Sequence, residues 1–278
     1  MMQRILILVA LLVGLAVLPQ PAPVQAASDL VNRKIEFTYL PPTDVKYQAV
    51  MERMQKSQVL EMLSQFLSPL RFPHAFYLVT SECGEANAYY NPDYWAINIC
   101  YEFFELIESV APKPGIPVQG FTRQEVIAGA FVGIVLHEVG HAVFDMFHVP
   151  VFGREEDAAD EMAGFIALQF NKDVARTIVR GYAFLWWEFA RRGEHKDWAD
   201  FSDEHGTHLQ RFYNVLCMGY GGDPETFREF IDKGMLPRER AANCANEFAK
   251  VKSAFAKTIL PFVDREMMKK VQETQWLK

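Results

Sequence analysis

A short run near the middle of the chain, His137-Glu138-Val139-Gly140-His141, has the residue types that bind and use a metal ion. Residues four apart in a helix lie on one face about one turn apart, so these two imidazoles can bind one zinc ion. The glutamate lies beside the pair, where it can take a proton from metal-bound water without being a ligand itself. The motif therefore predicts zinc-dependent hydrolysis, with His137 and His141 as ligands and Glu138 as the general base.

The surroundings of the motif predict a buried helix. Thr122 and Glu125 have the spacing of a capping box, which places the start of the helix there. The helix is expected to run to about Phe147, and Pro150 closes its exit. A His-Glu-His cluster inside a buried helix would leave charge unsatisfied without a metal, so burial supports a metal site.

Two histidines leave a catalytic zinc one protein ligand short. The acidic segment 155–161 follows a short loop and is expected to begin a second helix. Glu156 and Asp160 share one face of it, so Glu156 can be the third ligand while Asp160 accepts a hydrogen bond from a ligand histidine. We expect Glu155 and Asp157, on other faces, only to complement the helix dipole.

An HExxH motif followed by a helix with ExxAD resembles the gluzincin metallopeptidases, the thermolysin-like and related zincins. The matching residues are His137, Glu138, His141, Glu156 and Asp160. The resemblance implies a zincin-like fold, a Zn²⁺ cofactor and the same roles for these five residues. The short spacing from His141 to Glu156 implies a more compact variant than thermolysin itself.

The resemblance also implies two further features of the site. Asn87 and Ala88 match the edge strand whose backbone pairs with bound peptide, although an ordinary hairpin is the alternative. His205, oriented by Asp203, matches the histidine that stabilises the oxyanion, although a surface histidine near a helix start is the alternative. Arg211 could instead pair with the acidic helix that begins near residue 155, and its role stays open.

More narrowly, the chain resembles a family of uncharacterised bacterial proteins that are identified as metallopeptidases. That family implies the fold more than the substrate. The segments that carry this resemblance are 83–84, 87–90, 97–102, the helix of the HExxH motif, 153–160 and 210–214. His148 lies near a helix exit, and we interpret it as structural or peripheral because the third ligand is already supplied.

The order of the remaining elements predicts an α+β fold, in which a small mixed or antiparallel sheet with an edge hairpin comes first and helices follow. Expected strands cover 34–40 and 75–80, and a hairpin joins 87–90 to 95–101. A helix is expected over 45–67 and a loop over 111–120. Further helices are expected near 156–171, 173–192, 207–218, 224–233, 237–250 and 252–275. The N-terminal α+β lobe spans 34–148 and the helical lobe 150–278.

The first 26 residues have the pattern of a signal peptide. Arg4 precedes the apolar run 5–18, and Val24 and Ala26 supply the small residues that precede a cleavage site. The run is too short to span a membrane comfortably, so we expect cleavage after Ala26 and an exported single-domain chain, residues 27–278, that is periplasmic or secreted.

Export changes the interpretation of the four cysteines. An even count in an oxidising compartment predicts two disulfides, and four cysteines allow three connectivities. We expect near neighbours to pair, as Cys83–Cys100 and Cys217–Cys244.

Composition excludes several classes of protein. Half of the 278 residues are hydrophobic and 23% are charged, which argues against disorder. The net charge of −7 argues against a nucleic-acid partner. The sequence therefore predicts an exported zinc metallopeptidase acting on peptides or proteins. One alternative is a non-catalytic zinc-binding or peptide-binding protein on the same fold, and another is a chance motif.

Overall fold

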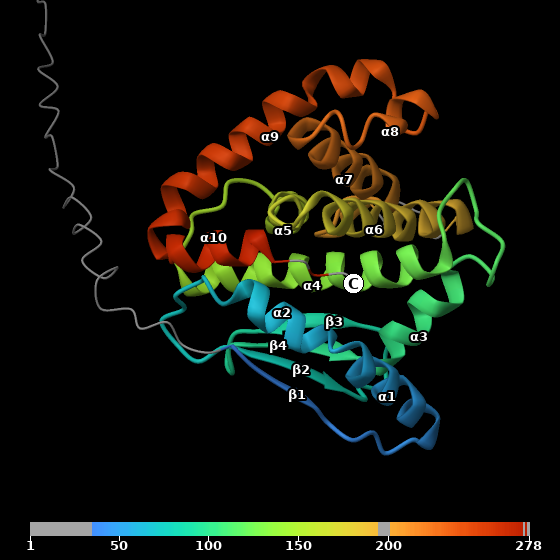
Figure 1. The fold of residues 1–278 in the computed structure, drawn as a ribbon, viewed down its shortest axis with the longest axis vertical. Coiled ribbons are helices and arrows are strands. Elements are labelled where there is room, and N and C mark those ends of the chain that lie inside the picture. The colour runs from blue at the N-terminus through green and yellow to red at the C-terminus, as the bar shows by residue number, and fades with distance from the viewer. Residues whose placement is uncertain (1–34, 194–200, 275, 277–278) are drawn as a thin grey trace, which may run out of the picture.

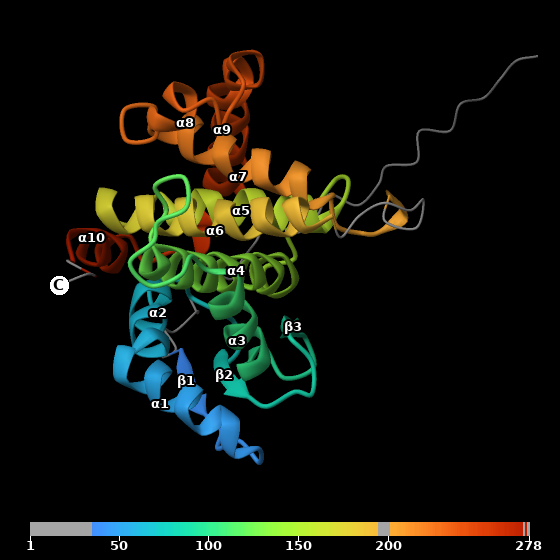
Figure 2. The ribbon, with the colours of Figure 1, turned by 90° about the vertical axis from the view of Figure 1, so that its right-hand side faces the viewer.

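The computed structural model describes residues 35–193, 201–274 and 276, so the expected signal peptide lies outside the described residues. The fold is α+β, as expected: a small sheet lies at one side and helices are stacked upon it (Figure 1). Figure 2 shows the same stack from another side, with α4 (Arg123–Met146) between the sheet and helices α5 (Glu155–Ala167), α6 (Lys172–Arg192) and α7 (His208–Gly222).

The sheet has four strands in the order β1-β2-β4-β3. β1 (Glu36–Tyr39), β2 (Tyr77–Ser81) and β4 (Ala96–Cys100) are parallel neighbours. β3 (Ala88–Asn91) runs antiparallel to β4, with Ala88 opposite Ile99, which confirms the expected hairpin. The sheet is therefore mixed, and β3 forms one of its edges.

The helices follow the expected order with several differences. They are η1 (Val45–Tyr47), α1 (Gln48–Ser57), α2 (Val59–Leu67), α3 (Tyr101–Val110), α4 (Arg123–Met146), α5 (Glu155–Ala167), α6 (Lys172–Arg192), α7 (His208–Gly222), α8 (Glu229–Asp232), α9 (Arg238–Thr258), η3 (Leu260–Phe262) and α10 (Arg265–Glu273).

Four expectations about these boundaries are wrong. The helix expected over 45–67 breaks at Gln58, whose φ of 51° is left-handed. Helix α3 was not predicted, because its apolar residues follow directly on the apolar residues of β4, without a turn between the two elements. The helix expected over 224–233 is reduced to α8. α9 continues past residue 251, and the break comes at η3, where Pro261 cannot continue a helical hydrogen-bond ladder.

Helix α4 is the central element of the fold. The predicted capping box of Thr122 and Glu125 begins it, with both reciprocal hydrogen bonds formed. It is long and apolar enough to cross a membrane, but 83% of its apolar window is buried inside the protein. Its apolar surface is therefore used in the core.

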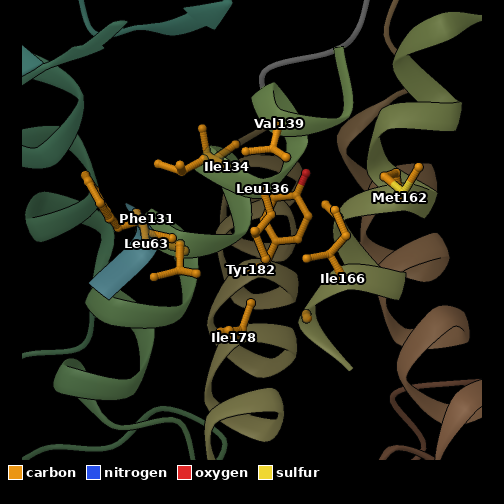
Figure 3. Close-up of a cluster of buried hydrophobic side chains, with 14 of the residues drawn as sticks. Leu63, Phe131, Ile134, Leu136, Val139, Met162, Ile166, Ile178 and Tyr182 are labelled. Atoms are coloured by element: carbon orange, nitrogen blue, oxygen red, sulfur yellow. The ribbon is translucent and has the colours of Figure 1, made fainter. Parts of the chain in front are cut away.

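Small residues let α4 approach its neighbours closely. A Cβ on Gly129 would lie 2.1 Å from the carbonyl oxygen of Thr177 in α6. A Cβ on Gly140 would lie 3.1 Å from the Cα of Ala159 in α5. Side chains from α2, α4, α5 and α6 then fill one continuous core (Figure 3): Leu63, Phe131, Ile134, Leu136, Val139, Met162, Ile166, Ile178 and Tyr182.

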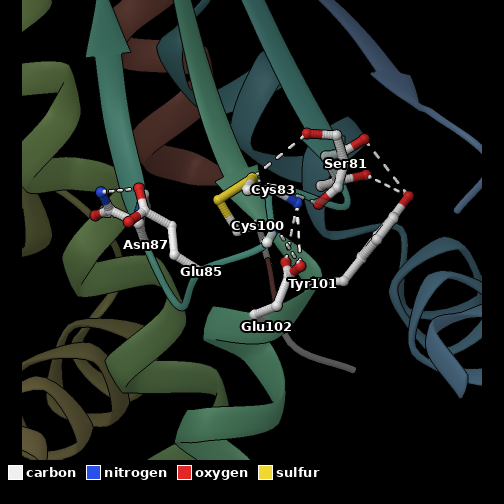
Figure 4. The surroundings of a disulfide bond; sticks show 10 residues. Ser81, Cys83, Glu85, Asn87, Cys100, Tyr101 and Glu102 are labelled. Carbon is white, nitrogen blue, oxygen red and sulfur yellow. Dashed lines mark hydrogen bonds between the residues drawn. A yellow bond between two sulfur atoms is a disulfide. The ribbon is translucent and has the colours of Figure 1, made fainter. Parts of the chain in front are cut away.

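Two disulfides join the cysteines in the expected pairs. Cys83, between β2 and β3, bonds to Cys100 at the end of β4 (Figure 4). Beside it, the carboxylate of Glu102 accepts hydrogen bonds from the backbone N–H groups of Cys83 and Gly84. Cys217–Cys244 joins α7 to α9. Two disulfides fit an extracellular or periplasmic location.

The contact between α4 and α6 makes a prediction about stability. Gly→Ala in an open helix position stabilises by about 1 kcal/mol, but Gly129→Ala must push backbone away from backbone. We expect Gly129→Ala to lower the free energy of unfolding by about 1–3 kcal/mol in urea denaturation. Ala128→Leu, on the exposed face of the same helix, is the control and should change it by about 0.5 kcal/mol or less. A stabilised Gly129→Ala protein would contradict the close contact.

Candidate metal centre

Three side chains from α4 and α5 converge at one point. His137 Nε2 lies 3.2 Å from His141 Nε2 and 3.0 Å from Glu156 Oε2. His141 Nε2 lies 3.4 Å from the same Glu156 oxygen. Ligands that each lie 2.0–2.1 Å from a tetrahedral zinc are separated from one another by about 3.3 Å. The three atoms therefore form a triangle of the size that fits one face of a zinc site.

Helix packing positions this triangle. His137 and His141 lie one turn apart on α4, and Gly140 between them allows Ala159 of α5 to come close. Glu156 lies three residues before Ala159, on the part of α5 that faces the histidines. The sequence expectation that these residues meet agrees with this geometry.

A carboxylate contacts the second nitrogen of each imidazole. Asp160 Oδ1 lies 2.9 Å from His137 Nδ1, and Glu155 Oε1 lies 2.8 Å from His141 Nδ1. Such contacts fix the tautomer, so that Nε2 presents its lone pair to the centre. The expectation that Glu155 only complements the helix dipole is wrong, because its carboxylate contacts His141 Nδ1. Asp157 instead pairs with Arg154 at 2.7 Å.

Asp160 is the most enclosed carboxylate of the site, only 2% exposed. Arg211 of α7 binds it with two N–H groups, each at 2.7 Å, and the Tyr182 hydroxyl of α6 donates to Oδ1. The guanidinium of Arg211 lies 3.6 Å from the centre of the Trp186 ring. Burial raises the pKa of Asp160, but Arg211 and His137 outweigh burial and hold that pKa well below its usual range.

Glu138 lies beside the triangle and is 7% exposed. Its Oε1 is 4.0 Å from His137 Nε2, and its Oε2 accepts a hydrogen bond of 2.9 Å from the backbone N–H of Tyr90 in β3. Burial raises the pKa of Glu138. A carboxylate with a raised pKa is better matched to proton transfer near neutral pH.

A cleft of about 660 Å³ opens over these residues. It is lined by Asn87, Ala88, Tyr89, Tyr90, Pro92, His137, Glu138, His141, Phe144, Asp145, Val149, Val151, Glu155, Glu156 and His205. The Asn87 carbonyl accepts from Cys100 N–H, so by the antiparallel alternation Ala88 and Tyr90 turn their backbone groups away from β4. The hydrogen bond from Tyr90 to Glu138 agrees with this, and the open edge of β3 therefore faces the cleft.

His205 approaches from the segment before α7. Its Nε2 lies 2.8 Å from Glu156 Oε2, and its Nδ1 lies 3.0 Å from Asp203 Oδ1. The expected partnership with Asp203 is therefore present. His148 is exposed just beyond the end of α4 and does not line the cleft.

Sequence reasoning missed three contributors to the site: Tyr182, Glu155 and the backbone N–H of Tyr90. The suggested pairing of Arg211 with the acidic helix is present, with Asp160 as its partner. Tyr182 and Arg211 are polar side chains in the middle of apolar helix faces, and that is a signal for a buried polar pair. The Tyr90 N–H has no such signal, because a backbone contact does not depend on the residue type.

Two histidines and a glutamate around a point in a cleft, beside a buried carboxylate, are typical of metal-dependent hydrolases. Comparison with protein families narrows this class of metal-dependent hydrolases further. Residues 39–259 match the family described as "Putative metallopeptidase", and the chain belongs to this family. The match includes every residue of the centre. No curated protein and no solved structure matches the chain.

The contacts of Asp160 make a prediction about the metal-free protein. Arg211→Met leaves a buried carboxylate without its countercharge, so the free energy of unfolding should fall by about 3–5 kcal/mol. Arg53→Met is the control, because the pair with Glu108 is partly exposed and should contribute less than about 1 kcal/mol. Urea denaturation measures both changes. Equal losses in the two variants would contradict a buried ion pair at Asp160.

Proposed function

We propose that the protein is an exported zinc-dependent metallopeptidase in which His137, His141 and Glu156 hold the metal. The observation that carries this proposal is their triangle of donor atoms, 3.0–3.4 Å apart, in a cleft beside the buried Glu138. Two imidazoles and one carboxylate are a donor set that zinc accepts in catalytic sites. When bound, zinc supplies a Lewis acid that polarises the scissile carbonyl and acidifies water.

Glu138 is the general base in this proposal. Tyr90 N–H holds Oε2, so Oε1 is directed towards the side of His137 where the donor atoms meet. From this position Glu138 takes the proton of the attacking water and delivers it to the leaving amine. Its raised pKa favours carrying the proton between the two steps.

The peptide substrate binds along β3. Ala88 and Tyr90 turn backbone groups towards the cleft, and an extended peptide can add to such an edge as a further strand. Asn87, at the start of the edge, also lines the cleft. Strand addition places a backbone carbonyl of the substrate over the centre with little dependence on the identity of its side chains.

His205 donates to the oxyanion that develops on the substrate. Asp203 contacts its Nδ1, which leaves Nε2 facing the centre, where it now meets Glu156. A donor aimed at developing negative charge contributes about 2.7–4 kcal/mol of transition-state stabilisation.

The proposal includes export. Residues 1–26 act as a signal peptide, and the mature chain, 27–278, is a single zincin-like domain with an α+β lobe over 34–148 and a helical lobe over 150–278. The two disulfides support maturation in an oxidising compartment, either the periplasm or the exterior.

The central test is Glu138→Gln. This variant should keep one zinc per chain and lose about 10²- to 10⁴-fold in kcat/KM, because only the proton acceptor is removed. Zinc is measured by elemental analysis, and hydrolysis by mass spectrometry of peptides from a digested proteome. His137→Ala is the control that should lose zinc.

The outcomes separate the alternatives. Retained cleavage by Glu138→Gln would contradict the role of Glu138 as the base. Stoichiometric zinc without any cleavage by the wild type would favour a non-catalytic zinc-binding protein. Equal zinc contents in the wild type and His137→Ala would reject the metal site.

Glu155 and Glu156 provide a matched pair for the assignment of the third ligand. Glu156→Ala should weaken zinc binding by more than about 100-fold, because it removes a donor atom of the triangle. Glu155→Ala removes only the contact with His141 Nδ1 and should weaken binding by about 10-fold. Competition with a chelator of known affinity measures both, and the reverse order would make Glu155 the ligand.

A further inference from the structure

One part of the cleft has no role in the proposed chemistry. On the C-terminal side of His141 in the sequence, the apolar side chains of Phe144, Val149 and Val151 line the cleft. The chain turns back at the end of α4, where Val149 N–H donates to the Phe144 carbonyl at 2.9 Å, so helix and loop form one surface. We call these three residues, together with Asp145, the distal shelf.

Asp145 places a carboxylate on the distal shelf. Its Oδ2 accepts a hydrogen bond of 2.7 Å from the Tyr90 hydroxyl. Burial and the nearby Asp145 raise the pKa of Tyr90, so this hydroxyl stays a donor and Asp145 stays the acceptor. Within the described residues, no lysine or arginine pairs with Asp145. Its negative charge is therefore available to a ligand.

The charge of the whole cleft has the same sign. Its lining includes four carboxylates, Glu138, Asp145, Glu155 and Glu156, and no lysine or arginine among the residues that the structure describes. A zinc ion brings two positive charges, which leaves a net charge of −2 with neutral histidines. Glu138, Glu155 and Glu156 contact the centre or its histidines, whereas Asp145 contacts none of them.

We propose that the distal shelf binds a lysine or arginine side chain of the substrate, which makes basic peptides the substrate class of this cleft. The inference rests on the proposed peptidase function. The aliphatic stem packs on Phe144, Val149 and Val151, and the cationic head reaches Asp145. Lysine and arginine bury their stems on apolar surface in this way while the charge stays near water.

The competing substrate is a wholly apolar side chain of the same length. Such a side chain would cover Asp145 without giving it a countercharge, and removing a carboxylate from water without one is costly. Norleucine has the length of lysine and lacks its charge, so it isolates the contribution of Asp145. An acidic side chain would be repelled by the cleft as a whole.

Binding can be measured without hydrolysis. Zinc-loaded Glu138→Gln protein is titrated with fluorescent peptides that differ only in one residue: lysine, arginine, norleucine or glutamate, scanned along an otherwise neutral sequence. At one position of the scan, lysine and arginine should bind about 3- to 5-fold more tightly than norleucine, because Asp145 is exposed and an exposed ion pair contributes less than about 1 kcal/mol. Adding Asp145→Asn should remove most of that difference, and Asp145→Lys should reverse it in favour of glutamate.

Glu204→Gln is the matched control for overall charge. Glu204 lines the neighbouring hollow with His141 and Glu155, but it is absent from the distal shelf. This variant should keep the lysine preference within about 2-fold, whereas an equal loss in Glu204→Gln and Asp145→Asn would overturn a specific site. The Asp145 variants should also keep one zinc per chain.

The result separates the two proposals. Lysine-selective binding that depends on Asp145, in a wild-type protein that cleaves nothing, would support the distal shelf and reject the peptidase. Cleavage by the wild type with no lysine preference, or with a preference unchanged by Asp145→Asn, would overturn the distal shelf alone.

Discussion

The rest of the structure depends on the contacts that the buried carboxylate of Asp160 makes. It lies on α5 and contacts His137 of α4, Tyr182 of α6 and Arg211 of α7. Four helices thus meet at one buried charge, and each must keep its position for the carboxylate to stay satisfied. A well-packed apolar cluster of the same volume is often as stable as a buried ion pair. The charge at this point is therefore better explained by the histidine that it orients than by stability.

The same constraint explains why α4 belongs to both the core and the site. Its apolar side chains fill the core, and its glycines allow α5 and α6 to approach. Any shift of α4 against α5 would separate the histidines from Glu156 and would also break the contact between His137 and Asp160. The packing that stabilises the fold therefore sets the distances between the donor atoms, and a metal need not draw them together from far apart.

The parts of the site that could be predicted are those encoded by local spacing. The i, i+4 pairs of α4 and α5, the capping box and the β3–β4 hairpin each depend on a few neighbouring residues. The contacts of Arg211 and Tyr182 with Asp160 span 51 and 22 positions, and they depend on helix packing that no local pattern specifies. Glu155 was misjudged because its position in the helical repeat places it on another face of α5. At the first residue of the helix, its side chain nevertheless reaches His141. The helix break at Gln58 has no glycine or proline to mark it, whereas the break at η3 follows from Pro261, a local signal that the prediction did not use.

The Cys83–Cys100 disulfide supports a part of the site that the core holds less than it holds α4 and α5. His137, His141 and Glu156 come from α4 and α5, which are packed against each other and against the core. The edge strand β3 and the segment before α7 lie at the margins of the cleft, where fewer apolar contacts are available. Cys83–Cys100 joins the approach to β3 to the end of β4, and Cys217–Cys244 fixes α7 to α9. Cross-links limit the alternative conformations of such segments, so Cys83–Cys100 helps to hold β3 at the wall of the cleft.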